Sequence, residues 1–148
     1  MSGVEQGELL GLAGGLEGLR AVIETFYDRV FDDVMIGFLF WKTDKARLIE
    51  KEVEFAARML GARDVVYTGK PIREAHAPHR IMGGHFDRRL QILKDSMAHH
   101  GLPEAVRVRW VQHTAALRPL VTADKDSNCS PEAAERRLEQ LRAEGLID

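Results

Sequence analysis

Apolar residues recur at intervals of three and four through most of this chain, and this period restricts its fold more than any other feature. Such spacing places the residues on one face of an amphipathic α-helix, whereas a half-buried strand alternates with a period of two. The chain is therefore predicted to be all-α. The clearest case is residues 16–32, where the apolar face is formed by Leu19, Val22, Ile23, Phe26, Val30 and Phe31.

Glycine, proline and capping residues mark the ends of the predicted helices. A short helix over residues 6–12 is expected to end at Gly14 and Gly15. Thr43 or Asp44 can cap a helix that stops at Gly61. Three further helices are predicted: from Pro71 to about His76, from the Gly83–Gly84 break to Gly101, and from Pro103 to about Val121. Pro119 is expected to disturb the last turn of the third helix.

Two segments do not follow the helical period. Residues 33–43 hold too many apolar side chains for one helical stripe, so they are predicted to form a tight apolar corner rich in aromatic residues. Residues 65–67, Val-Val-Tyr, are the one strand-like run and do not support a sheet.

The carboxyl end of the chain differs in composition from the rest. Residues 122–130 are polar and turn-rich, and Ser130 with Pro131 then favours a helix to about Glu144. Its narrow apolar edge, which includes Leu138 and Leu141, is better suited to docking on a surface than to independent folding. We therefore expect a globular domain over residues 1–121, followed by a linker and helical appendage over residues 122–148.

Charge and cysteine content exclude several classes of protein. The formal charge of −2 argues against general binding to nucleic acid or anionic membrane, because both need a basic excess. No apolar stretch reaches membrane-spanning length, and the acidic, Gly-rich amino end lacks the pattern of a signal peptide. The single cysteine, Cys129, cannot form an internal disulfide and agrees with a cytoplasmic location.

The chain has six histidines, each either an ordinary polar residue or a metal ligand. His76 has the strongest context for a ligand, because Pro71 and Pro78 restrain its backbone. His79 could share a zinc ion with it, but Pro78 interrupts the helix and no cysteine completes the site. His85 suits a helix cap or the surface, and His99 and His100 suit the end of a helix.

Two polar residues lie on predicted apolar faces. Glu52 falls among Leu48, Phe55 and Met59, where a carboxylate must be paired, hydrogen-bonded or protonated. It either turns to the helix edge and pairs with a surface cation or lines a ligand cavity. Tyr27 either satisfies its hydroxyl on the backbone or points it at a ligand.

Together these segments resemble the truncated haemoglobins over roughly residues 8–121. The resemblance rests on five matches in order: Ala-Gly-Gly at 13–15, FYDRVFDD at 26–33, FLFWKTD at 38–44, RLIEKEVEFAARMLG at 47–61 and YTGKPIREAHAPHRIMGGHFD at 67–87. The YTG, AH and HFD elements together are similar to group I. The AHAPH segment is closer to group II, and Ala62 stands where the family often has a second glycine. The implied fold is a two-over-two helical sandwich around haem, with an extra C-terminal helix here.

The resemblance also implies a haem b cofactor and residues that hold it. His76 matches the proximal iron ligand, Tyr27 the distal tyrosine, and Phe40 the aromatic wedge against the haem. Leu48 and Glu52 match two distal helix positions, the second of which is commonly glutamine. Phe55 is expected to keep the pocket dry, and Lys51 or Arg73 to pair with haem propionates. The other residues expected at the haem are Tyr67, Ile72 and Phe86.

The implied function is binding of dioxygen and nitric oxide, with Tyr27 and Glu52 controlling the reaction. Conversion of nitric oxide to nitrate is the activity that the resemblance favours, supported by an unidentified reductase. A peroxidase-like enzyme using Glu52 for proton transfer is an alternative, and so is a haem-free globin domain that binds a partner. A monomer or weak homo-oligomer is expected.

Overall fold

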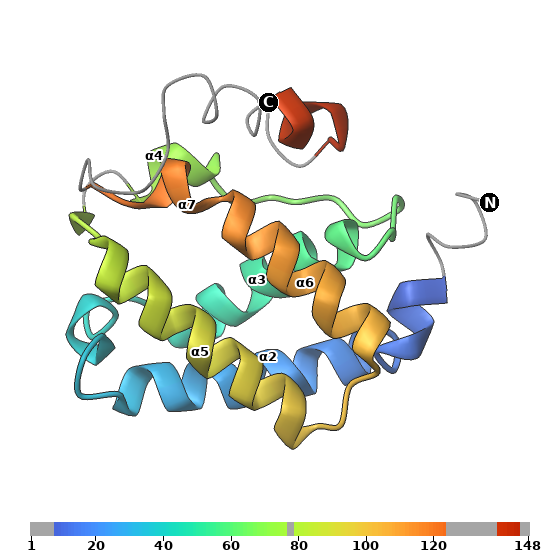
Figure 1. Ribbon diagram of the computed structural model, residues 1–148, viewed down its shortest axis with the longest axis horizontal. Coiled ribbons are helices and arrows are strands. Elements are labelled where there is room, and N and C mark those ends of the chain that lie inside the picture. The colour runs from blue at the N-terminus through green and yellow to red at the C-terminus, as the bar shows by residue number, and fades with distance from the viewer. Residues whose placement is uncertain (1–7, 77–78, 124–138, 146–148) are drawn as a thin grey trace.

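The computed structural model describes residues 8–76, 79–123 and 139–145, and helices account for most of them (Figure 1). Residues 8–12 form a short first helix, as predicted. The elements that follow are α2 (Gly15–Asp32), the 3-10 turn η1 (Gly37–Leu39), α3 (Lys45–Met59), α4 (Ile72–His76), α5 (Gly83–His99), α6 (Glu104–Ala116) and α7 (Arg118–Val121). Within these described ranges there is no strand, only an isolated bridge between Ile81 and Thr122.

The long helices form two layers around one core. Helix α2 packs against α3 and α5 packs against α6, while contacts of α2 with α5 and of α3 with α6 join the layers (Figure 1). Removing their apolar faces from water stabilises this arrangement. The predicted all-α, two-over-two fold is thus confirmed. Its fully buried side chains include Leu19, Ile23, Phe26, Leu93, Met97 and Val106.

Two predicted helix starts are confirmed by local geometry. Gly14 and Gly15 have φ values of 91° and 69°, which disfavour residues with a Cβ, and they turn the chain into α2. The Asp44 side chain accepts a hydrogen bond of 3.2 Å from the backbone N–H of Arg47 and so caps α3.

Two expectations about local structure are corrected. Gly83 and Gly84 do not precede a helix but form the first turn of α5, where a backbone N–H needs no intrahelical acceptor. The predicted helix over residues 103–121 divides at Leu117 into α6 and α7, so Pro119 has a larger effect than the predicted disturbance of the last turn. Proline has no N–H to donate to the backbone hydrogen bonds of a continuous helix. The predicted corner at 33–43 places Ile36 in the core, while Val34 at 97% and Trp41 at 69% are exposed.

The described part of the tail, residues 139–145, lies on the helical core. Leu141 is 2% exposed and belongs to the main hydrophobic cluster. Arg58 Nη2 donates to the Gly145 carbonyl at 3.3 Å, and Arg109 pairs with Glu144 at 3.5 Å. The predicted helix start at Ser130 and Pro131, the linker with Cys129, and Leu138 lie outside the described residues, as does Pro78.

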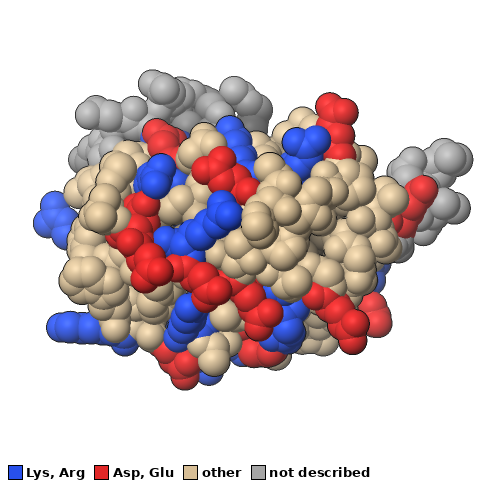
Figure 2. All heavy atoms as spheres, turned by 90° about the horizontal axis from the view of Figure 1, so that it is seen from below, with Lys and Arg blue, Asp and Glu red and all other residues tan. Residues whose placement is uncertain are grey.

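The surface carries charges of both signs. Figure 2 shows acidic and basic side chains interleaved over the face seen from below in Figure 1. Pairs such as Arg20–Glu50 at 2.6 Å and Arg88–Asp33 at 2.7 Å neutralise one another locally. None of the helices in the described ranges is long and apolar enough to cross a lipid bilayer.

Candidate functional site

A cavity of about 280 Å³ lies between the two helical layers. Helices α2, α3, α4, α5 and α6 all contribute to its wall, together with the corner that holds Phe40. Apart from Arg73, the structure brings together the site residues that the sequence predicted, since each of them lines this cavity: Tyr27, Phe40, Leu48, Lys51, Glu52, Phe55, Tyr67, Ile72, His76 and Phe86. Arg73, the alternative to Lys51, is not among the lining residues.

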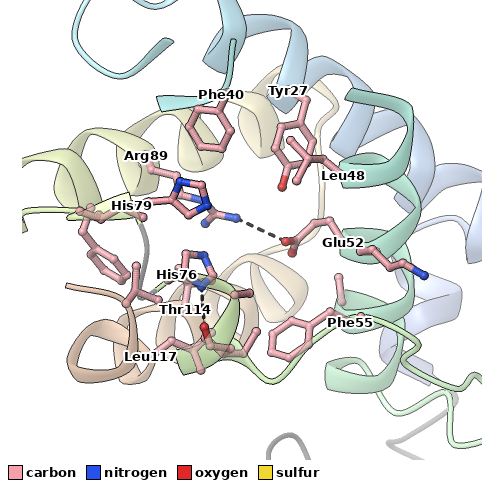
Figure 3. A pocket seen from close by; sticks show the side chains of 18 of the residues that line it. Tyr27, Phe40, Leu48, Glu52, Phe55, His76, His79, Arg89, Thr114 and Leu117 are labelled. Carbon is pink, nitrogen blue, oxygen red and sulfur yellow. Dashed lines mark hydrogen bonds and ion pairs between the residues drawn. The ribbon is translucent and has the colours of Figure 1, made fainter. Parts of the chain in front are cut away.

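His76 ends the five-residue helix α4, and its ring is tied to that helix. Its Nδ1 lies 2.7 Å from the carbonyl oxygen of Ile72 (Figure 3). A carbonyl can only accept, so Nδ1 carries the hydrogen and Nε2 keeps its lone pair. Burial lowers the pKa of His76, and the hydrogen bond to Ile72 opposes this shift only in part. The ring is therefore neutral at physiological pH, with one nitrogen able to bind a metal.

Tyr27 and Glu52 contribute polar groups from α2 and α3 (Figure 3). The Tyr27 ring is 4% exposed and makes edge contacts with Phe26 at 4.9 Å and Phe40 at 6.3 Å between centroids. Burial raises the pKa of the Tyr27 hydroxyl, and the nearby charge of Glu52 raises it further. The hydroxyl therefore stays protonated and can donate a hydrogen bond.

Glu52 combines parts of the two interpretations that the sequence left open. Its carboxylate lines the cavity, and its Oε1 lies 3.4 Å from Nη2 of Arg89, which lines the cavity as well. The Glu52 side chain is 17% exposed, so it has not turned out to solvent. Burial raises the pKa of Glu52, and the positive charge of Arg89 offsets part of this rise.

Sequence reasoning missed Arg89 and His113. Arg89 lies three residues after Phe86 and four before Leu93, hence on the apolar stripe of α5, and this position was a detectable signal. Its guanidinium carbon lies 4.8 Å from the centroid of the Phe26 ring, a cation–π contact. His113 likewise lies three residues after Trp110 on the inner face of α6.

His113 is a buried imidazole on the cavity wall. It is 5% exposed, and its ring centroid lies 5.6 Å from that of Phe55. Within the described ranges its Nε2 has no hydrogen-bond partner. Burial lowers the pKa of His113 to about 4, and Arg109 adds to the effect, so the ring is neutral near pH 7.

His85, His79 and Lys51 each have a defined place at or near the cavity. His85 Nδ1 accepts a 3.0 Å hydrogen bond from the Met82 backbone N–H at the start of α5, which confirms its predicted capping role. His79 also lines the cavity, yet the described residues contain no cluster of three or more His, Cys, Asp or Glu that could hold a metal ion. Lys51 Nζ donates to the Thr68 hydroxyl.

Comparisons with known proteins agree with this architecture. The family model described as bacterial-like globin matches residues 9–123. The chain is 35% identical over 106 residues to the group 1 truncated haemoglobin GlbN of Mycolicibacterium paratuberculosis, covering 72% of this chain and 77% of that one. It is 30% identical over 95 residues to GlbN of Synechocystis, covering 62% and 76%. The ferric crystal structure of truncated haemoglobin from Tetrahymena pyriformis superposes with a TM-score of 0.72 at 23% identity, covering 78% of this chain and 98% of that one.

Proposed function

This chain belongs to the bacterial-like globin family and is similar to its group 1 truncated haemoglobins, and we propose that it holds haem b on His76 and binds dioxygen and nitric oxide. Membership of the family implies a haem cofactor and the binding of small diatomic ligands. The single observation that carries the residue assignment is the His76–Ile72 hydrogen bond, because it leaves Nε2 of a neutral imidazole for the iron.

The residues of the cavity fit a haem group. A porphyrin needs apolar walls on both faces, and Phe40, Leu48, Phe55 and Phe86 offer them. The iron needs a neutral nitrogen donor, which His76 provides. Propionates need cations near the edge of the site, and Lys51 is our candidate for that contact.

Haem, when bound, would supply an iron atom able to bind a diatomic gas. His76 would hold the group in place from α4, and its bond to Ile72 would fix the orientation of the ring. Tyr27 would donate its hydroxyl hydrogen to a polar ligand in the cavity, and the apolar side chains around it would exclude competing water. These residues favour slow release of dioxygen.

The reaction that we favour converts nitric oxide and dioxygen to nitrate. It consumes one electron for each nitrate formed, which an unidentified reductase would supply. We place the protein in the cytoplasm as a monomer or weak homo-oligomer, with its globin domain over residues 1–121 and the tail as an appendage. Mixing the oxygenated protein with nitric oxide tests the reaction: nitrate formed in equal amount supports it, and nitrite or no product refutes it.

Replacement of His76 tests its assignment. The full chain is loaded with haem, reduced, and compared with His76→Ala and with the matched control His79→Ala by visible absorption. We expect the five-coordinate ferrous spectrum to be lost in His76→Ala alone. An unchanged spectrum in His76→Ala would assign the ligand to another histidine. Absence of a Soret band in the wild-type protein would refute haem binding and favour a haem-free domain.

A second candidate is peroxide-linked redox catalysis, and the arrangement of Glu52 and Arg89 favours it. A carboxylate whose pKa is raised by burial can accept a proton from peroxide and return it to the departing oxygen. Peroxide-dependent oxidation of an aromatic donor should then fall at least ten-fold in Glu52→Gln. Equal rates in the two proteins would exclude this role.

A further inference from the structure

Arg89 reaches inward from α5. Its guanidinium lies 4.8 Å from the centroid of Phe26, whose side chain is 1% exposed, and 3.4 Å from the Glu52 carboxylate on the cavity wall. The pKa of the Tyr27 hydroxyl responds to Arg89 as well as to Glu52, so the three groups are near neighbours. A permanent positive charge therefore lies on the wall that Tyr27 and Glu52 form (Figure 3).

The interaction between Glu52 and Arg89 is weak. It consists of one hydrogen bond of 3.4 Å, which is long for an N–H···O hydrogen bond, and it uses one of the five N–H donors of the guanidinium. Arg88, the preceding residue, differs: its Nε and Nη2 bind Asp33 at 3.0 and 2.7 Å on the outside of the fold. Arg89 also donates to the Tyr27 hydroxyl oxygen, which offsets a small part of the rise in the pKa of Tyr27. With these two contacts Arg89 still keeps N–H donors that can turn to a ligand, whereas Arg88 is engaged with Asp33 through both Nε and Nη2.

The charges around the cavity favour a negative ligand. Among the residues that the structure describes, four basic side chains line it, Arg47, Lys51, Lys70 and Arg89, against the single carboxylate of Glu52. A low-dielectric wall strengthens the attraction between such an excess and a small anion. Haem propionates would neutralise cations near the edge, but Arg89 is engaged with Phe26 and Glu52 instead.

We propose that Arg89 is the residue that sets the affinity of this cavity for small monovalent anions, which its guanidinium would bind once haem is present. The proposal rests on the proposed function, since it needs haem in the cavity. The anion would accept hydrogen bonds from Arg89 and Tyr27, and it would displace Glu52 from the guanidinium. Glu52 is thus a competitor for Arg89, so its charge weakens anion binding.

Azide titration of the ferric, haem-loaded full chain at pH 7 tests this proposal, with the Kd read from visible absorption. Arg89→Gln is compared with Arg88→Gln, which removes the same charge from the same helix but outside the cavity. We expect the azide Kd to rise about ten-fold or more in Arg89→Gln and to change less than two-fold in Arg88→Gln. Equal values for the two variants would overturn the proposal.

Glu52→Gln gives an independent measurement if Arg89→Gln fails to fold or to retain haem. Removing the competing carboxylate should lower the azide Kd several-fold, and an unchanged or higher Kd would overturn the proposal. Carbon monoxide titration of the reduced wild-type protein separates this result from the proposed function. A protein that binds carbon monoxide but shows no Arg89 effect on azide refutes only the anion site, whereas a protein that binds no carbon monoxide refutes the globin function as well.

Discussion

Replacing Tyr27 with phenylalanine isolates one hydrogen bond in the ligand cavity. The phenyl ring keeps the edge contacts with Phe26 and Phe40, so the variant loses the hydroxyl and little packing. A hydrogen bond to a charged or strongly polarised acceptor contributes about 1.5–3 kcal/mol, which corresponds to a rate change of roughly 10- to 100-fold. The nearby Glu52 carboxylate can also accept the hydroxyl hydrogen and so competes with the ligand for it, and we therefore expect the lower end, about ten-fold faster dissociation of dioxygen.

The assay is rapid mixing of the oxygenated protein with a ligand trap, followed by absorption. Tyr67→Phe is a matched control, because Tyr67 is the second of the two tyrosines and lines the same cavity, but its hydroxyl already donates to the Lys70 carbonyl at 2.8 Å. Its dissociation rate should stay within two-fold of wild type. If Tyr27→Phe releases dioxygen as slowly as wild type, or if both variants accelerate it equally, the assignment of the Tyr27 hydroxyl to the ligand is wrong.

Three further predictions concern stability in urea, followed by tryptophan fluorescence. Because the pKa of Glu52 is raised in the folded state, the folded protein binds more protons than the unfolded chain. The free energy of unfolding should therefore fall as pH rises from the ordinary carboxyl range towards that raised pKa. Glu52→Gln should remove this decline, and a decline that persists in the variant would assign it to another group. The pKa of His113 is lowered to about 4, so the free energy of unfolding should rise by roughly 3 kcal/mol from pH 4 to 6.5. His113→Leu should flatten this dependence of stability on pH. Parallel pH profiles for the variant and the wild-type protein would contradict the burial of His113. Leu141→Ala should lower the free energy of unfolding by about 2 kcal/mol, whereas the exposed Gln140→Ala should change it by less than 0.5 kcal/mol; equal effects would show that the tail unfolds separately.

The helices were predictable from the sequence where the apolar period and the caps agree. Residues 16–32 were predicted as a helix that the structure places at Gly15–Asp32, and the Asp44 cap has the expected side-chain hydrogen bond. The division at Leu117 was underestimated because a proline within a periodic segment can either bend a helix or end it, and tertiary packing decides between them.

The residues of the cavity were predictable as a set, but their polar contacts were not. Glu52 required a partner on energetic grounds, yet local spacing cannot identify one thirty-seven positions away on another helix. Arg89 and His113 occupy inward positions of their helices, where a polar residue is easily overlooked among apolar neighbours. The exposure of Trp41 was not predictable, because apolar density alone does not show which side of a corner faces the core.

The short helix α4 couples the proposed iron ligand, His76, to the backbone. Because the His76 ring is hydrogen-bonded to the carbonyl of Ile72, where that helix begins, main-chain geometry helps to set the direction of the Nε2 lone pair. Ile72 is 8% exposed and itself forms part of the cavity wall, so the carbonyl that orients His76 belongs to a residue that would contact the porphyrin. If His76 binds iron as we propose, unwinding of these five residues would release this ligand while the two helical layers remain folded.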